Sequence, residues 1–231
     1  MIADKLQLVR QRVAAACDQA GRAVQSVTLL AVSKTFDADA VRAAVAAGEH
    51  RFGENYVLEG VEKITALADL RTPSGTALEW HLIGPLQSNK TRIVAEHFDW
   101  VHSVDRLKIA QRLAEQRPAH LAPLQVCLQV NISGEASKSG LRQGDVAEVA
   151  RAVAALPRLV LRGLMAIPEP AAEFEAQRVP HRALRELLTQ LRATGLTTMD
   201  TLSMGMSADL EAAIIEGATI VRVGSAIFGA R

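Results

Sequence analysis

The fold of this chain is indicated first by one stretch, Thr28-Leu29-Leu30-Ala31-Val32-Ser33-Lys34-Thr35. An apolar run of strand character ends there in Ser-Lys-Thr, and Asp37 and Asp39 then mark the start of a helix. A cation at the mouth of a buried strand is costly unless it is solvated or used by a function. Both readings fit this lysine alone, and the rest of the chain favours a functional one.

The same order of strand and helix continues to the end of the chain. Strands are expected at residues 28–33, 51–53, 79–83, 100–103, 124–131, 159–166, 198–202 and 219–223. Helical spacing of apolar residues separates them, and an extra helical pattern precedes the first strand. Alternating units predict a parallel sheet with right-handed crossovers. Eight such units predict an α/β fold, a single (β/α)8 TIM barrel with an additional N-terminal helix. An open doubly wound sheet is the alternative.

Length and composition agree with one barrel domain over residues 1–231, because no Pro/Gly/Ser-rich linker is long enough to divide the chain. Hydrophobic residues make up 49% of the sequence, and 26 basic and 25 acidic residues leave a net charge of +1. This balance predicts no nucleic-acid surface. No apolar run approaches the ~18 residues of a membrane span, and the first residues lack a secretion signal. We therefore expect a cytoplasmic protein without a membrane partner.

Metal binding is not indicated by the spacing of cysteine and histidine. Cys17 and Cys127 lie far apart and outside any Cys-x-x-Cys motif, which is typical of reduced core thiols. No His-Glu-x-x-His motif is present. We expect no metal site.

Functional groups of a (β/α)8 barrel collect at the C-terminal ends of its strands. After strands seven and eight the chain has Ser203-Met204-Gly205 and Gly224-Ser225. Glycines let a backbone approach a phosphate, and hydroxyl and N–H groups donate to it. Each pair is also an ordinary Gly/Ser turn, but together they stand at the two positions where such barrels commonly bind phosphate.

Strand alternation directs two cations into the same mouth. Lys34 shares a face with Leu30 and Val32, and Arg222 shares one with Ile220. A guanidinium there needs an acceptor, either a ligand or an internal carboxylate. An amine near Arg222 and above apolar side chains is suited to attack an aldehyde. Lysine, arginine and phosphate-binding turns in one mouth suggest pyridoxal phosphate. On strand three, His81 either lines the ligand or is a hydrogen-bonded core histidine.

Several stretches resemble the pyridoxal phosphate homeostasis proteins, a family of small cofactor-binding barrels. The matching segments are residues 31–35, 51–57, 80–90, 101–107, 129–133, 135–140, 163–167, 202–210 and 221–229. They run through nearly the whole chain in the family's order. Two departures are small: Phe36-Asp37 stands where Lys-Pro is often found, and Ser225 stands where threonine is common.

The resemblance implies a fold like the N-terminal domain of alanine racemases, with Lys34 as the residue that forms a covalent imine with pyridoxal 5′-phosphate. It implies that Ser203, Gly224 and Ser225 hold the phosphate, with the Met204 backbone beside them. It also implies ring contacts, with Arg222 at the pyridine nitrogen and a lining of further residues: Asn55, His81 and Met165. No catalytic residue is implied.

The function implied is that of a non-catalytic carrier that binds the cofactor and helps regulate its free level. Such a carrier is expected to be a monomer that transfers cofactor to transiently bound acceptor enzymes. An amino-acid racemase or decarboxylase is the alternative, but a racemase of this type brings a further β domain and an acid/base tyrosine, for which no chain is left after Phe228. A lysine-imine aldolase that binds a sugar phosphate is a third reading.

Overall fold

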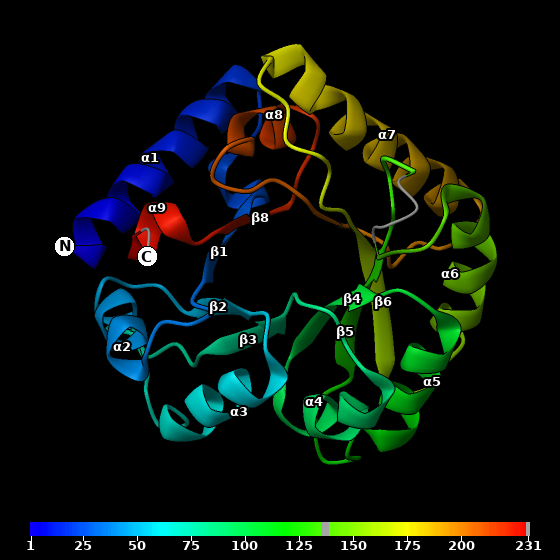
Figure 1. The fold of residues 1–231 in the computed structure, drawn as a ribbon, viewed down its shortest axis with the longest axis horizontal. Coiled ribbons are helices and arrows are strands. Elements are labelled where there is room, and N and C mark those ends of the chain that lie inside the picture. Colours follow the sequence, from blue (N-terminus) through cyan, green and yellow to red (C-terminus); the bar gives the residue numbers. More distant parts are fainter. Residues whose placement is uncertain (135–138, 230–231) are drawn as a thin grey trace.

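A computed structural model describes residues 1–134 and 139–229 of the chain. Within them, parallel strands close into a barrel in the order of the sequence, β1-β2-β3-β4-β5-β6-β7-β8 (Figure 1). The strands are β1 Thr28–Val32, β2 Arg51–Glu54, β3 Glu79–Leu82, β4 Trp100–Val104, β5 Leu124–Gln129, β6 Leu159–Met165, β7 Thr201–Ser203 and β8 Ile220–Val223. The predicted (β/α)8 barrel is confirmed, because β1 pairs with both β2 and β8 and an open sheet would leave an edge.

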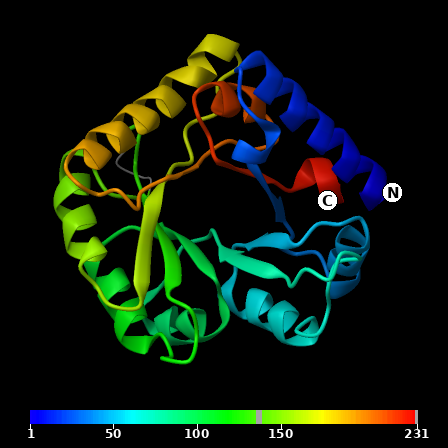
Figure 2. The ribbon, with the colours of Figure 1, turned by 180° about the vertical axis from the view of Figure 1, so that it is seen from behind.

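Helices form an outer ring around the barrel, which is visible from both sides (Figures 1 and 2). They are α1 Ile2–Gln19, α2 Ala38–Ala46, α3 Val57–Ala66, α4 Thr91–His97, α5 Leu107–Gln116, α6 Val146–Ala154, α7 Phe174–Ala193, α8 Leu210–Ile215 and α9 Ser225–Phe228. Three short 3-10 helices are η1 Val24–Ser26, η2 Ser88–Lys90 and η3 Gln143–Asp145. The predicted extra helix, α1, lies beside α8 and α9 at the end of the chain.

The seventh strand is shorter than the sequence pattern predicts. It begins at Thr201 instead of residue 198. Thr198 donates its hydroxyl to the carbonyl oxygen of Leu161, and Asp200 forms a bidentate ion pair with Arg162. The residues just before β7 are therefore held by side-chain hydrogen bonds instead of by strand pairing.

Apolar side chains form two separate layers, as expected for a barrel wrapped in helices. The larger cluster fills the space between the strands and the helices and includes Leu6, Phe52 and Phe98. A smaller cluster fills the barrel interior: Leu30, Val32, Ile83, Trp100, Cys127, Met165 and Ile220. Both cysteines are buried free thiols, and burial raises the pKa of Cys127 to about 12. Both are free and buried, as the sequence predicts for reduced core thiols.

Two kinds of feature are absent from the described residues. Among them no helix is both long and apolar enough to cross a bilayer. No group of three or more metal-binding side chains is found in residues 1–134 and 139–229.

Candidate functional site

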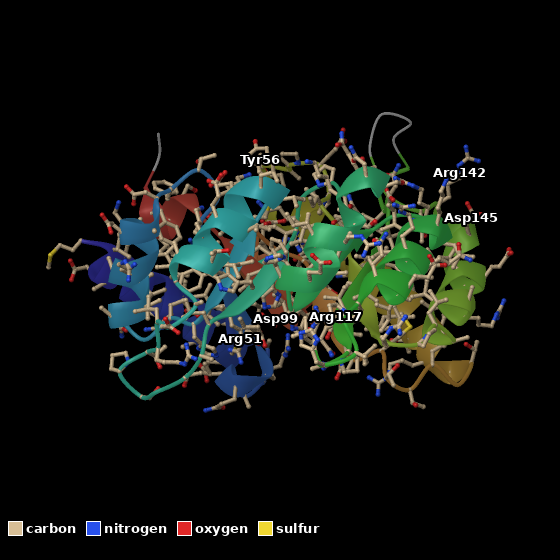
Figure 3. The ribbon with its side chains drawn as sticks, turned by 90° about the horizontal axis from the view of Figure 1, so that it is seen from below. Arg51, Tyr56, Asp99, Arg117, Arg142 and Asp145 are labelled. Carbon is tan, nitrogen blue, oxygen red and sulfur yellow. The ribbon has the colours of Figure 1, made fainter. Side chains whose placement is uncertain are left out.

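The turns that follow β1 and β8 lie at the same end of the barrel. In the side view, Tyr56, which follows β2, and Arg51, which begins β2, lie at opposite ends (Figure 3). Lys34, Gly224 and Ser225 follow β1 and β8, and these strands are neighbours through the pair Ala31 and Val223. A Cβ atom on Gly224 would lie 3.1 Å from the carbonyl oxygen of Val32. The lysine turn and the Gly-Ser turn are therefore adjacent at the C-terminal mouth.

Lys34 lies in a tight turn whose backbone is unusual. The turn runs from Ser33 to Phe36 and is closed by the Phe36 N–H, which donates to the Ser33 carbonyl at 3.1 Å. Thr35 has φ 65°, in the left-handed region where glycine is normally found. Such a residue costs about 1–3 kcal/mol and persists only when its surroundings hold it. The half-buried Lys34 is therefore presented by a strained, supported turn.

Arg222 lies inside the barrel, as the alternation of β8 predicts, and is only 4% exposed. It donates to the hydroxyl of Ser203 at 2.8 Å and to the carbonyl of Ala166 at 2.9 Å. Burial lowers the pKa of Arg222 to about 10, although the charge of Asp209 opposes this shift. The guanidinium stays protonated at neutral pH, and both of these acceptors are uncharged. Neither hydrogen bond therefore neutralises the guanidinium charge.

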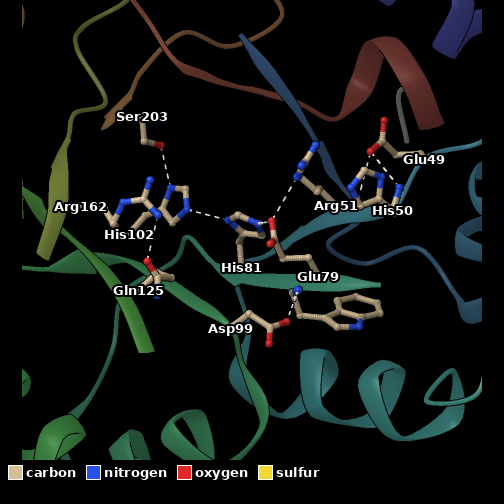
Figure 4. Close-up of polar contacts among 11 residues, drawn as sticks. Glu49, His50, Arg51, Glu79, His81, Asp99, His102, Gln125, Arg162 and Ser203 are labelled. Carbon is tan, nitrogen blue, oxygen red and sulfur yellow. Dashed lines mark hydrogen bonds and ion pairs between the residues drawn. The ribbon is translucent and has the colours of Figure 1, made fainter. Parts of the chain in front are cut away.

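From Ser203, a series of hydrogen bonds continues through the barrel interior (Figure 4). Ser203 Oγ lies 2.7 Å from Nδ1 of His102, whose Nε2 lies 2.9 Å from Nδ1 of His81. His81 Nε2 lies 2.9 Å from Glu79 Oε1, to which Arg51 also donates at 3.2 Å. Together these hydrogen bonds connect Arg222 of β8 with the first residues of β2 and β3.

The donors fix every proton in this series. An arginine only donates, so Ser203 accepts from Arg222. A carboxylate only accepts, so a neutral His81 has its proton on Nε2 and offers Nδ1 to the Nε2–H of a neutral His102, whose Nδ1 then accepts from the Ser203 O–H. Both histidines are therefore Nε2–H tautomers.

The pKa values agree with these protonation states. Burial lowers the pKa of His81, and burial together with nearby His81 and Arg222 lowers the pKa of His102 well below its usual value. Burial alone would raise the pKa of Glu79, but the hydrogen bonds from His81 and Arg51, together with the charge of Arg51, outweigh it and lower the pKa. The interior series therefore has a cation at the mouth, two neutral histidines and a carboxylate at the other end.

Three predicted site residues have partners that the sequence did not indicate. The Ser203 hydroxyl is engaged by Arg222 and His102. The Met204 N–H donates to the Ile220 carbonyl at 3.1 Å, within the barrel's ladder. His81 is separated from Arg222 by two side chains and lines a groove at the N-terminal strand ends. It is a hydrogen-bonded core histidine, stacked on Trp100.

The loops after β7 and β8 meet as expected. Ser225 Oγ lies 3.5 Å from Ser207 Oγ, so hydroxyls from both loops face the same place. Gly205 has φ 91°, and a Cβ atom there would lie 2.5 Å from the Cβ of Ala213. Only glycine allows this close turn between β7 and α8. The two loops together offer the donors that a phosphate requires.

Asn55 follows β2, which pairs with β1, and Met165 ends β6, which pairs with β7. Met165, at the end of β6, is fully buried in the interior cluster. The Oδ1 atom of Asn55 is buried and has no hydrogen-bond partner. It lines a cavity of about 300 Å³ together with Ile83, Gly84 and Ile167. A buried polar atom without a partner is rare, and a ligand donor would satisfy it.

Larger hollows lie at the opposite end of the barrel. Grooves of about 410 and 530 Å³ lie at the N-terminal ends of the strands, and both are larger than the mouth cavity. The first groove is lined by paired charges, Arg162 with Asp200 and Arg51 with Glu79. Because these charges satisfy one another, the chemistry favours the mouth.

Sequence reasoning missed His102 and the support beneath Lys34. His102 is the third residue of β4, as His81 is of β3, so alternation on neighbouring strands was an available signal. Under the lysine turn, Lys63 of α3 bonds Glu54, Glu59 and the Ser33 carbonyl. Its only sequence signal is the i, i+4 spacing of Glu59 and Lys63.

This barrel is of the type found in alanine racemases, since residues 6–231 match the family described as alanine racemase, N-terminal domain. A pyridoxal phosphate homeostasis protein of Pseudomonas aeruginosa is 61% identical over 230 residues, which cover 100% of this chain and 96% of the relative. The Escherichia coli K12 protein of that name is 55% identical over 230 residues, covering 100% and 97%. The chain belongs to the family of pyridoxal phosphate homeostasis proteins.

Solved structures agree with this assignment. PipY of Synechococcus elongatus, solved with pyridoxal phosphate bound, is 36% identical with a TM-score of 0.85, covering 99% of this chain and 100% of that one. Alanine racemase of Corynebacterium glutamicum is 20% identical with a TM-score of 0.72, covering 100% of this chain and 61% of that one. The racemase shares the fold.

Proposed function

We propose that this protein binds pyridoxal 5′-phosphate at the mouth of the barrel and helps to regulate its intracellular level without catalysing a reaction. The observation that carries the proposal is the placement of Lys34 beside the Gly224-Ser225 turn, in the mouth that Arg222 enters from the interior. The names of the relatives and the cofactor bound in PipY support the same ligand.

The proposed site divides the cofactor among three groups of residues. Lys34 would hold the aldehyde group of the cofactor as an imine, with its amine as the nucleophile. Gly224 and Ser225, with Ser207 opposite, hold the phosphate. Asn55 and Met165 line the ring, and the Asn55 amide oxygen gains a partner.

Arg222 faces the ring nitrogen in this proposal. When bound, the cofactor supplies an electron sink, and that sink is strongest when the ring nitrogen is protonated. A guanidinium held by Ser203 and Ala166 disfavours that proton. Ser203, His102 and His81 act on the cofactor through Arg222, and the Met204 backbone holds the adjoining ladder. The arrangement suits reversible storage better than carbanion chemistry.

The carrier is proposed to be a cytoplasmic monomer that passes the cofactor to transiently bound acceptor enzymes. A racemase or decarboxylase is the second candidate, favoured only by the fold shared with alanine racemases. General acid/base groups contribute ~10²–10⁴-fold in such enzymes. In the proposal, the mouth of this chain supplies none to the cofactor.

The test is an absorbance spectrum of the protein with pyridoxal phosphate, followed by borohydride reduction and peptide mapping. The wild-type protein should show a visible imine band that reduction fixes onto Lys34. Lys34→Ala should lose the band and the label, whereas Lys108→Ala, at an exposed lysine of α5, should keep both. A label on any other lysine of the wild-type protein would reject the assignment.

A further inference from the structure

A buried ionic cluster lies directly under the turn that carries Lys34. We name it the Lys63 cluster, and it consists of Lys63 and Glu59 on α3 and Glu54 at the end of β2. Lys63 is 5% exposed and Glu54 is fully buried. All three donors of the Lys63 ammonium are used: on Glu54 at 2.8 Å, on Glu59 at 2.7 Å and on the Ser33 carbonyl at 2.7 Å.

The cluster holds both neighbours of Lys34. On one side, Ser33 is bound through its carbonyl to Lys63 and through its hydroxyl, at 2.6 Å, to Glu54. On the other side, the Thr35 N–H donates to the Glu59 carboxylate. Glu59 thus satisfies the backbone N–H of Thr35, one of two non-glycine residues with a positive φ in the described part of the chain, and such a φ must be imposed by the surroundings.

Local packing brings α3 close enough to make these contacts. A Cβ atom at Gly60 would lie 2.6 Å from Phe98 Cζ and 3.3 Å from the Glu54 Cβ. Glycine at this position therefore lets the helix seat Glu59 and Lys63 against the end of β2. A simple solubilising role does not explain an ammonium with three short bonds in the core, because burying charges is costly even when they are paired.

From this geometry we infer that the Lys63 cluster is a positioning device for Lys34. By fixing Ser33 and Thr35, it fixes the direction in which the lysine side chain leaves the turn. The amine then meets the aldehyde of a bound cofactor without further ordering of the backbone, which favours formation of the C=N bond. Glu59 is the positioning residue that can be tested most cleanly, because its side chain is 25% exposed and its loss leaves Lys63 two acceptors. This inference rests on the proposed function.

The experiment compares Glu59→Ala with the wild-type protein in binding two ligands. Pyridoxal 5′-phosphate can form the imine, whereas pyridoxamine 5′-phosphate has the same ring and phosphate but no aldehyde. Glu59→Ala should bind the aldehyde form about tenfold more weakly, the scale of one charge-assisted hydrogen bond. The affinity of Glu59→Ala for the amine form should stay within about twofold of the wild-type value, since that ligand forms no C=N bond with Lys34.

Two further variants complete the comparison. Glu59→Gln keeps a carbonyl acceptor for the Thr35 N–H and should recover most of the aldehyde affinity. Glu62→Ala removes an exposed carboxylate from the same helix and should match the wild type. Glu62 and Glu59 both line a groove on the outside of α3, which makes this variant a matched control. Amide hydrogen exchange of the apo proteins adds a readout without cofactor, and exchange at Thr35 should be faster in Glu59→Ala alone.

The outcomes separate the two proposals. The positioning role is overturned if Glu59→Ala binds pyridoxal phosphate with unchanged affinity. It is also overturned if the affinities for the aldehyde form and the amine form fall by the same factor. A wild-type protein that takes no label at Lys34 overturns the proposed function and, with it, the role in forming the linkage. In that case the exchange data from the apo proteins still show whether Glu59 holds the turn.

Discussion

Replacing His102 should change how the stability of this protein depends on pH. His102 is fully buried between Ser203 and His81. Burial, followed by the nearby His81 and Arg222, lowers the pKa of His102 well below its usual value. In His102→Gln the amide can still donate to His81 and accept a hydrogen bond, but it cannot take up a proton.

The sign follows from the lowered pKa. Below about pH 6.5, the ordinary pKa of histidine, the unfolded chain binds a proton at residue 102 that the folded protein refuses. The stability contributed by neutral His102 is therefore complete above about pH 6.5 and is lost as the pH falls toward the lowered pKa. One such proton amounts to about 1.4 kcal/mol per pH unit when fully developed, and to about 1.2 kcal/mol between pH 6 and pH 5.

Urea unfolding at several pH values between 5 and 8 measures this difference. The wild-type free energy of unfolding should fall by about 1.2 kcal/mol more than that of His102→Gln between pH 6 and pH 5. His120→Gln, at an exposed histidine outside the chain of hydrogen bonds, is the matched control and should follow the wild type. Parallel curves for wild type and His102→Gln would refute the assignment of a neutral His102 in the interior.

Three other outcomes are expected. Gly60→Ala should lower the free energy of unfolding by about 1–3 kcal/mol, because its Cβ would meet Phe98, whereas Gly144→Ala, with open space around it, should not; urea midpoints compare them. Ser203→Ala should lower the free energy of unfolding by about 1–3 kcal/mol and shift the absorbance of the bound cofactor, because Arg222 loses an acceptor. An unchanged spectrum would contradict the proposal that Ser203 acts on the cofactor through Arg222. Incubation with L-alanine and pyridoxal phosphate should form no D-alanine by chiral chromatography, and turnover above a protein-free blank would favour the racemase reading.

The order of the elements could be predicted from the sequence because it depends on local patterns. Strand-like runs separated by helical spacing gave eight units, and all eight strands lie where those runs are, with β7 starting late. Alternation within a strand also placed Arg222 in the interior, since successive side chains of a strand point to opposite faces. The position of Lys34 at the mouth followed from the same rule.

Partners between distant segments could not be predicted in this way. His81, His102 and Ser203 are joined only because closure of the barrel brings β3, β4 and β7 around one interior. The sequence shows a serine in the same way whether its hydroxyl binds a phosphate or an arginine. Its partner depends on the stagger of the strands, which no local pattern encodes.

The sequence by itself determined a barrel with a lysine at its mouth, because hydrophobic periodicity and strand ends are local properties of the chain. Only the tertiary structure decided how that lysine is held. The cluster of Lys63, Glu54 and Glu59 joins β2 and α3 to the turn after β1. Its charges are stable in the core only when folding brings all their partners within hydrogen-bond distance.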